Sequence, residues 1–222
     1  ARSIRHPLAR ALLALTLSTG LVDAVSYLGL GRVFTANMTG NIVLLGFGIA
    51  GGEGLPVVAP LVSLGAFLGG SAIGGVLAMT TADRHPQHVA RTLVIEIGLL
   101  LAAAIVAATA DVRPSTFSGD AVIAMLALAM GVRNATVRRL AVPDLTTTVL
   151  TMTLTGLAAD SRLAGGSGKG SVRRIAAVLA MLIGALAGAL LLKISLVPPL
   201  LAAAAIALVV ALAYVPFAHR QA

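Results

Sequence analysis

The chain of 222 residues is 58% hydrophobic and only 11% charged, with a formal net charge of +8 and no cysteine. A soluble domain would carry about a quarter charged residues, so too little polar sequence is present to cover a water-exposed surface. The composition predicts an all-α polytopic membrane protein, with one membrane domain over 1–222 in a lipid bilayer. Basic residues gather in membrane-protein loops, so we expect no nucleic-acid partner. Disulfides and thiol catalysis are excluded.

Six apolar segments are long enough to cross a bilayer, which takes about 20 residues. They lie at about 10–30, 55–79, 91–110, 119–139, 173–194 and 197–217. The first follows a basic stretch, as in a signal peptide, but its apolar run is longer, so we interpret it as a span. Two further segments, 38–51 and 147–159, would each be only about 20 Å long as helices, which is less than the roughly 30 Å of hydrocarbon.

Basic residues distinguish two topologies for these short segments. If both segments cross, giving eight spans, the sixteen basic residues divide nine to seven between the two sides. If both enter and return, giving six spans, thirteen lie on the side of the termini, and the other side keeps only Arg32, Arg113 and Lys193. We therefore predict six transmembrane helices, two re-entrant half-helix hairpins and both termini in the cytoplasm.

The order of features occurs twice along the chain. Each half reads span, polar turn with short helix, Gly-rich span, span. GLVDAVSYLGLGRVFTAN at 20–37 aligns with GVRNATVRRLAVPDLTTT at 131–148, and GGSAIGGVLA at 69–78 aligns with IGALAGALLL at 183–192. Because each half has three spans, the two halves would have opposite orientations in the membrane. This predicts a 3+3 inverted-topology repeat over 10–112 and 119–217, as in many secondary transporters.

In such a repeat the two half-helices begin near the membrane midplane, and each start exposes unpaired N–H groups and a partial positive charge. Transporters bind substrate between discontinuous helices of this kind. We expect Thr35, Asn37 and Thr39 to cap the first half-helix, and the threonines at 146–148 to cap the second. The candidate substrate-binding residues are Asp23, Tyr27, Thr35, Asn37, Thr39, Asn41, Asn134, Asp144, Thr146, Thr147 and Thr148.

The acidic residues of the spans and turns each allow more than one role. Asp23 could take up a coupling proton, bind a cation or hydrogen-bond the substrate. Equally, it could be a structural carboxylate bonded to Asn37, Asn41 or a backbone N–H of the hairpin. Asp144 suits a cap of the second half-helix, and Glu96 suits pairing with a neighbour or snorkelling.

Two further features concern the surroundings of these turns. Arg133, Arg138 and Arg139 form a predicted cytoplasmic cluster, which would either set orientation or guide an anion inward. Tyr27, Phe34 and Phe47 could line a pocket, although ordinary packing would place them equally well.

No nucleophile–base pair or metal-ligand set occurs in the spans, so we expect neither an enzyme nor a metal or cofactor.

Small residues recur at four-residue spacing in two of the spans, a pattern that lets helices approach closely and also suits a homodimer through the Gly-rich helices. They are Gly65, Gly69, Gly70, Gly74, Gly184 and Gly188.

GLVDAVSYLGLGRVFTANMTGN and GVRNATVRRLAVPDLTTTVLTMTLTGLAAD resemble the YoaK-like family over nearly the whole chain. The resemblance implies a multi-pass protein of the bacterial inner membrane and supplies no catalytic residue. The paired half-helices are also similar in architecture to those of sulfate and nucleobase transporters, which have more spans per repeat.

These observations favour a small-solute secondary transporter or facilitator. Its solute would lie between the half-helix starts near Asn37 and Thr147, and the positive helix ends favour an anionic or carboxylate-bearing solute. Two alternatives remain. A channel with the same hairpins would need a continuous polar pore. A non-transporting scaffold or sensor would have no cavity reaching the Asn and Thr groups.

Overall fold

A computed structural model describes residues 6–80, 85–140, 147–148 and 150–219, and these residues form helices and loops with no strand among them. The helices in chain order are α1 (Pro7–Ala24), the π-helix η1 (Val25–Gly29), α2 (Met38–Ile49), α3 (Val58–Thr80), α4 (His85–Thr109), α5 (Phe117–Leu140), α6 (Thr151–Ala159), the 3₁₀ helix η2 (Arg162–Ala164), α7 (Ser171–Leu192) and α8 (Val197–His219).

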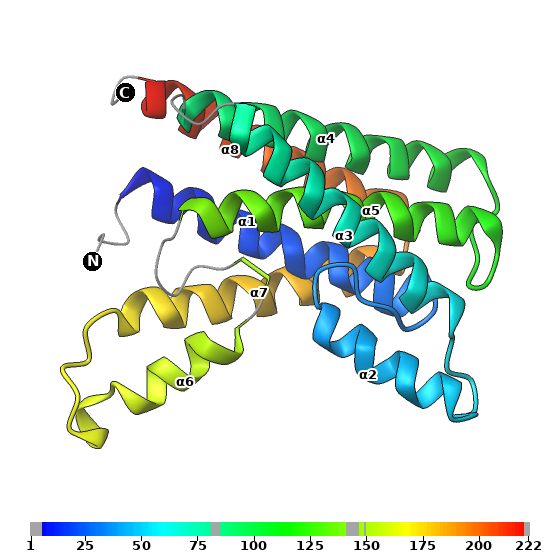
Figure 1. Ribbon diagram of the computed structural model, residues 1–222, viewed down its shortest axis with the longest axis horizontal. Coiled ribbons are helices and arrows are strands. Elements are labelled where there is room, and N and C mark those ends of the chain that lie inside the picture. The colour runs from blue at the N-terminus through cyan, green and yellow to red at the C-terminus, as the bar shows by residue number, and fades with distance from the viewer. Residues whose placement is uncertain (1–5, 81–84, 141–146, 149, 220–222) are drawn as a thin grey trace.

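The prediction of six helices of membrane-spanning length is confirmed. Six helices are long and apolar enough to cross a membrane: Pro7–Gly29, Val58–Thr80, Pro86–Thr109, Phe117–Leu140, Ser171–Leu192 and Val197–Ala218. They lie side by side in one bundle, and α1 begins at the same end at which α8 ends (Figure 1). Large apolar side chains on the outer helices, such as Leu182 and Leu186 of α7, are exposed, as expected where a bundle meets lipid rather than water.

Glycines allow two pairs of spans to touch through their backbones. Gly20 of α1 packs on α7, where a Cβ would come within 2.6 Å of the backbone nitrogen of Ala185. Gly131 of α5 packs on α3, where a Cβ would come within 2.8 Å of the backbone nitrogen of Ser71. The two contacts occupy aligned positions of the two halves of the sequence. No side chain fits at either glycine without moving the partner helix.

The predicted Gly-rich stripes are divided between two environments. Gly70 and Gly74 face α5, and Gly184 and Gly188 face α1, so these four serve packing within the chain. A Cβ at Gly65 or Gly69 on α3 would meet nothing within 4 Å, which leaves both on an open face. The predicted homodimer stays a prediction.

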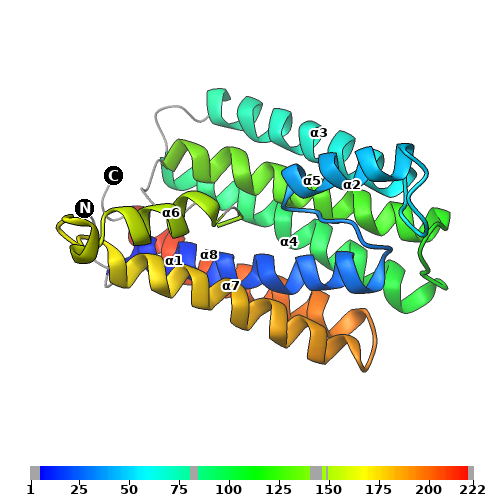
Figure 2. The same ribbon diagram turned by 90° about the horizontal axis from the view of Figure 1, so that it is seen from below.

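The short helices α2 and α6 both begin near the middle of the bundle's length and run to opposite ends, as Figures 1 and 2 show from two directions. α2 starts as predicted, because Asn37 is its N-cap and accepts a hydrogen bond from the N–H of Gly40 at 3.3 Å. α6 starts only at Thr151, with Leu150 at the N-cap and no side-chain cap. The prediction that Thr147 or Thr148 caps this helix is wrong. Thr146 and Asp144 lie outside the described residues.

Basic residues gather at one end of the bundle, which we call the basic end. Among the described residues, the opposite end holds Arg32, Arg113 and Lys193. The helix ends and loops of the basic end carry Arg10, Arg91, Arg138, Arg139, Arg162, Lys169, Arg173 and Arg174.

Candidate functional site

The extended segment that precedes α2 is fastened to the bundle by one buried amide. Asn41 accepts a hydrogen bond from the N–H of Phe34 at 2.8 Å, and its Nδ2 donates to the carbonyl oxygen of Phe34 at 2.6 Å. The same Nδ2 donates to Ser63 Oγ at 3.1 Å, and this hydroxyl also donates to the Phe34 carbonyl at 2.7 Å. Asn41 and Ser63 are fully buried. Asn41 therefore holds the turn in place rather than facing a solute.

Asp23 holds the other side of the same segment. Its Oδ1 accepts hydrogen bonds from the backbone N–H groups of Thr35 at 3.4 Å and Ala36 at 3.3 Å. These are the contacts expected of a structural carboxylate, one of the two roles the sequence left open. Thr35 is buried, and its hydroxyl has no partner among the described residues.

A cavity of about 410 Å³, here called the central cavity, lies beside this segment. The residues that line it come from η1, the segment before α2, α2 itself and the start of α6: Tyr27, Phe34, Asn37, Thr39, Gly40, Val43, Leu44 and Thr151. The N-cap of α2 and the first residue of α6 thus line one space. Its volume falls in the range of about 300–1,000 Å³ typical of small-molecule sites.

The described residues that line the central cavity supply polar groups and no charged side chain. Within the described part of the chain, neither the Asn37 Nδ2 nor the hydroxyls of Tyr27, Thr39 and Thr151 donate to a protein partner. Each is therefore available to a bound molecule. The exposed N–H groups and positive dipole ends of two helix starts add to this donor surface.

The start of α6 is positioned differently from that of α2. Thr148 donates to Asn134 Oδ1 at 2.7 Å, while Asn134 Nδ2 donates to the Met130 carbonyl one turn back along α5. Thr147 is buried and has a positive φ of 63°, a conformation that is rare for a β-branched residue. Neither threonine belongs to α6, which begins at Thr151.

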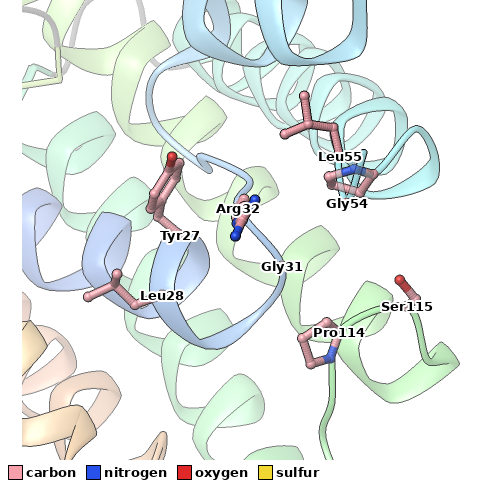
Figure 3. Close-up of a pocket in the computed structure, with 9 residues that line it drawn as sticks. Tyr27, Leu28, Gly31, Arg32, Gly54, Leu55, Pro114 and Ser115 are labelled. Carbon is pink, nitrogen blue, oxygen red and sulfur yellow. The ribbon is translucent and has the colours of Figure 1, made fainter. Parts of the chain in front are cut away.

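A second cavity, the loop cavity, lies at the end opposite the basic end and has a volume of about 600 Å³. Figure 3 shows Tyr27 on one side of it, Leu55 and Pro114 on the other, and Arg32 between them. Tyr27 lines both the loop cavity and the central cavity, and its ring stacks on Phe34 with centroids 4.9 Å apart. Tyr27 is thus common to the two cavities, whereas Phe34 lines only the central cavity.

Arg133 does not belong to a cytoplasmic cluster, so that prediction is wrong. Its side chain is 2% exposed and forms a buried ion pair with Glu96 of α4. The remaining guanidinium donors meet α1, at the carbonyl oxygen of Leu15 (2.9 Å), Thr19 Oγ1 (2.8 Å) and Ser18 Oγ (3.1 Å). All five N–H donors of the arginine are used, which is what a buried guanidinium requires.

The predicted site residues divide into three groups. Tyr27, Asn37 and Thr39 line the central cavity. Behind them, Asp23, Thr35 and Asn41 belong to the hydrogen-bonded turn, and Asn134, Thr147 and Thr148 position the start of α6. Sequence reasoning missed Thr151, Val43 and Leu44. The only signal for Thr151 was its place in the Thr-rich run before GLAAD, which does not single it out. Phe47 is exposed and does not line the cavity.

Six apolar spans in a helical bundle define the class: a multi-pass membrane protein. The family model described as "Protein of unknown function (DUF1275)" matches residues 11–213, so the chain belongs to this family. Among curated proteins it is similar to the UPF0700 transmembrane protein YoaK of Bacillus subtilis (strain 168), with 33% identity over 147 residues. That match covers 66% of this chain and 64% of YoaK, less than two thirds of the relative's length. No solved structure matches the chain.

Proposed function

We propose that this protein is a small-solute transporter or facilitator of the bacterial inner membrane, whose solute binds in the central cavity. One observation carries the proposal: the starts of the two short helices reach the same cavity, α2 through Asn37 and α6 through Thr151. Secondary transporters use discontinuous helices in this way, with the substrate at the exposed helix starts near the midplane.

The solute is small and anionic or carboxylate-bearing. The polar groups available in the cavity are three hydroxyls and one amide NH₂, all of which can donate hydrogen bonds. Two positive helix ends add to their effect, and none of the described residues that line the wall is acidic. The rings of Tyr27 and Phe34 and the side chains of Val43 and Leu44 supply apolar walls for the rest of the solute.

The six spans form a 3+3 inverted repeat in which α2 and α6 are the helical arms of two re-entrant hairpins. Two findings support this arrangement. Gly20 of α1 contacts the backbone of α7, and Gly131 of α5 contacts the backbone of α3. These two contacts occupy aligned positions of the two halves. The two short helices also run from the middle of the bundle to opposite ends (Figure 1). The basic end lies in the cytoplasm with both termini, in keeping with the positive-inside rule.

A transporter suits the cavities better than an open channel does. The central cavity and the loop cavity share Tyr27, whose ring stacks on Phe34, and we assign this aromatic pair as the gate between them. A gate of this kind allows alternating access, whereas a channel needs one continuous polar path. A purely structural scaffold would have no reason to leave Asn37 and Thr39 facing a cavity.

The proposal is tested by adding carboxylates to purified and reconstituted protein. The probes are acetate, lactate and benzoate, with acetamide, lactamide and benzamide as uncharged controls. We expect at least one carboxylate, but not its amide, to raise the thermal unfolding temperature and to enter proteoliposomes that contain the protein.

A matched pair of variants on α2 connects any such effect to the cavity. Val43→Phe adds a ring at a position that lines the central cavity, whereas Ile42→Phe adds the same ring at the adjacent position, which does not line it; both positions are exposed. We expect Val43→Phe to abolish the response and Ile42→Phe to retain it. No response to any carboxylate, or an equal loss in both variants, would overturn the proposal.

A further inference from the structure

A third cavity, of about 620 Å³, lies between α3 and α5 toward the basic end. We call it the arginine cavity because Arg138 and Arg139, in the last turn of α5, line it. Its other walls reach deeper into the bundle, to Ser71 and Phe67 on α3. Phe67 lies eleven residues before Ala78, or about 16 Å along the helix at 1.5 Å per residue. The cavity therefore combines a basic part near the helix ends with an uncharged part, lined by Phe67, Ser71, Gly75, Asn134 and Ala135, at the depth of acyl chains.

Among the described residues, no acidic side chain forms an ion pair with either arginine of this cavity. Arg138 makes no hydrogen bond or ion pair with any described residue, and Arg139 donates to the Ala78 carbonyl at 2.9 Å, which fixes its position. Two acidic side chains of the described residues are engaged elsewhere, since Glu96 pairs with Arg133 and Asp160 pairs with Arg174. Guanidinium groups in this state are suited to phosphate, which they bind through paired N–H donors.

The surroundings of the cavity favour a lipid as the source of that phosphate. The neighbouring face of α3 exposes Leu68, Val76 and Met79, which are more than half exposed and belong to a lipid-facing surface. Gly75 lines the cavity from the same helix, and a Cβ there would meet nothing within 4 Å, so the space continues beside the backbone. Basic pockets between spans at the cytoplasmic side are suited to anionic headgroups.

We propose that the arginine cavity binds an anionic phospholipid, with the phosphate at Arg138 and Arg139 and an acyl chain along Gly75 toward Phe67. The site is distinct from the solute site, because no described residue lines both cavities. Bound lipid would connect the end of α5 with α3.

Native mass spectrometry of the detergent-purified full chain tests this proposal, with phosphatidylglycerol as the anionic probe and phosphatidylcholine as the zwitterionic one. We expect the protein to retain phosphatidylglycerol preferentially. Arg138→Gln, which removes no protein hydrogen bond among the described residues, should weaken that binding about tenfold, the effect of losing a charge-assisted hydrogen bond. Arg91→Gln, an exposed arginine of α4 outside the cavity, should leave it unchanged.

A second pair of variants leaves both arginines intact. Gly75→Leu fills the arginine cavity, whereas Gly69→Leu adds the same side chain at another open position of α3 that does not line it. We expect lipid retention to fall in Gly75→Leu alone. Equal retention of both lipids by the unmodified chain, or equal behaviour of the two leucine variants, would overturn the site. Displacement of the lipid by inorganic phosphate at an equal concentration would overturn the lipid assignment and identify a soluble phosphate as the ligand.

Discussion

The buried pair of Arg133 and Glu96 gives the sharpest prediction on stability. Glu96→Met leaves the guanidinium buried without a counter-charge, and Arg133→Met leaves the carboxylate in the same state. The double variant leaves no charge at all. Arg133 aligns with Val22 in the first half of the chain. Val22 is fully buried, so an apolar side chain already occupies the corresponding place of that half.

The expected size follows from the contacts. Glu96 accepts two hydrogen bonds from Arg133, through Nε at 3.0 Å and through the second guanidinium nitrogen. Breaking one partner of a buried pair costs about 3–5 kcal/mol, whereas replacing both partners with apolar side chains is often neutral. For a chain of this size, that loss lowers the unfolding temperature by about 6–20 °C. In the double variant Thr19 keeps a hydrogen bond to the Leu15 carbonyl at 3.0 Å, so α1 loses little.

Thermal unfolding in detergent, followed by far-ultraviolet circular dichroism, measures these differences in a chain that has no tryptophan and only two tyrosines. We expect both single variants to unfold well below the unmodified protein and the double variant to unfold above either single variant. A double variant whose loss equals the sum of the two single losses would show that the two side chains do not act as a pair.

Three further changes test the packing and the turn before α2. Gly184→Leu would place its Cβ against the carbonyl oxygen of Leu17, so this variant should fail to give a monodisperse peak in size-exclusion chromatography. Gly69→Leu, at an open position, should elute normally. Equal profiles of the two variants would contradict the packing described above. Asn41→Ala leaves buried groups of the preceding turn unpaired and should lower the free energy of unfolding by about 1–3 kcal/mol or more, measured by the same thermal unfolding assay. Asp23→Asn keeps an oxygen that accepts the two backbone hydrogen bonds and should unfold at a higher temperature than Asp23→Ala; similar temperatures for the two would argue against a positioning role.

The six spans could be predicted from the sequence because length and apolarity alone define them. The start of α2 could also be predicted, since Asn37 is a strong N-cap residue at the head of an apolar run. The start of α6 could not. Its sequence offers several threonines in a row, and the boundary depends on the contact between Thr148 and Asn134 across the fold. Local capping rules do not include such a contact.

Arg133 shows the same limit for charge. The positive-inside rule treats every basic residue near a span end as a loop charge. Glu96, the partner of Arg133, lies 37 residues away in the sequence and on another helix. The pair therefore cannot be predicted until the packing of α4 against α5 is known. The polar turns of the sequence predicted a cavity between the two short helices. That Thr151 and Val43 line it depends on two features of the fold: α6 begins only at Thr151, and α2 turns one face toward the cavity.

The claim on which the proposed site depends is that both short helices turn back instead of crossing. The chain contains no cysteine, so single cysteines can report the side of the membrane on which each loop lies. Glu53→Cys follows α2 and Ser167→Cys follows α6, and both positions are exposed. In intact cells a membrane-impermeant thiol reagent should modify Glu53→Cys directly and Ser167→Cys only after the membrane is opened. Modification of both cysteines from the same side would mean that the short helices cross, and the shared cavity could not lie between two re-entrant hairpins.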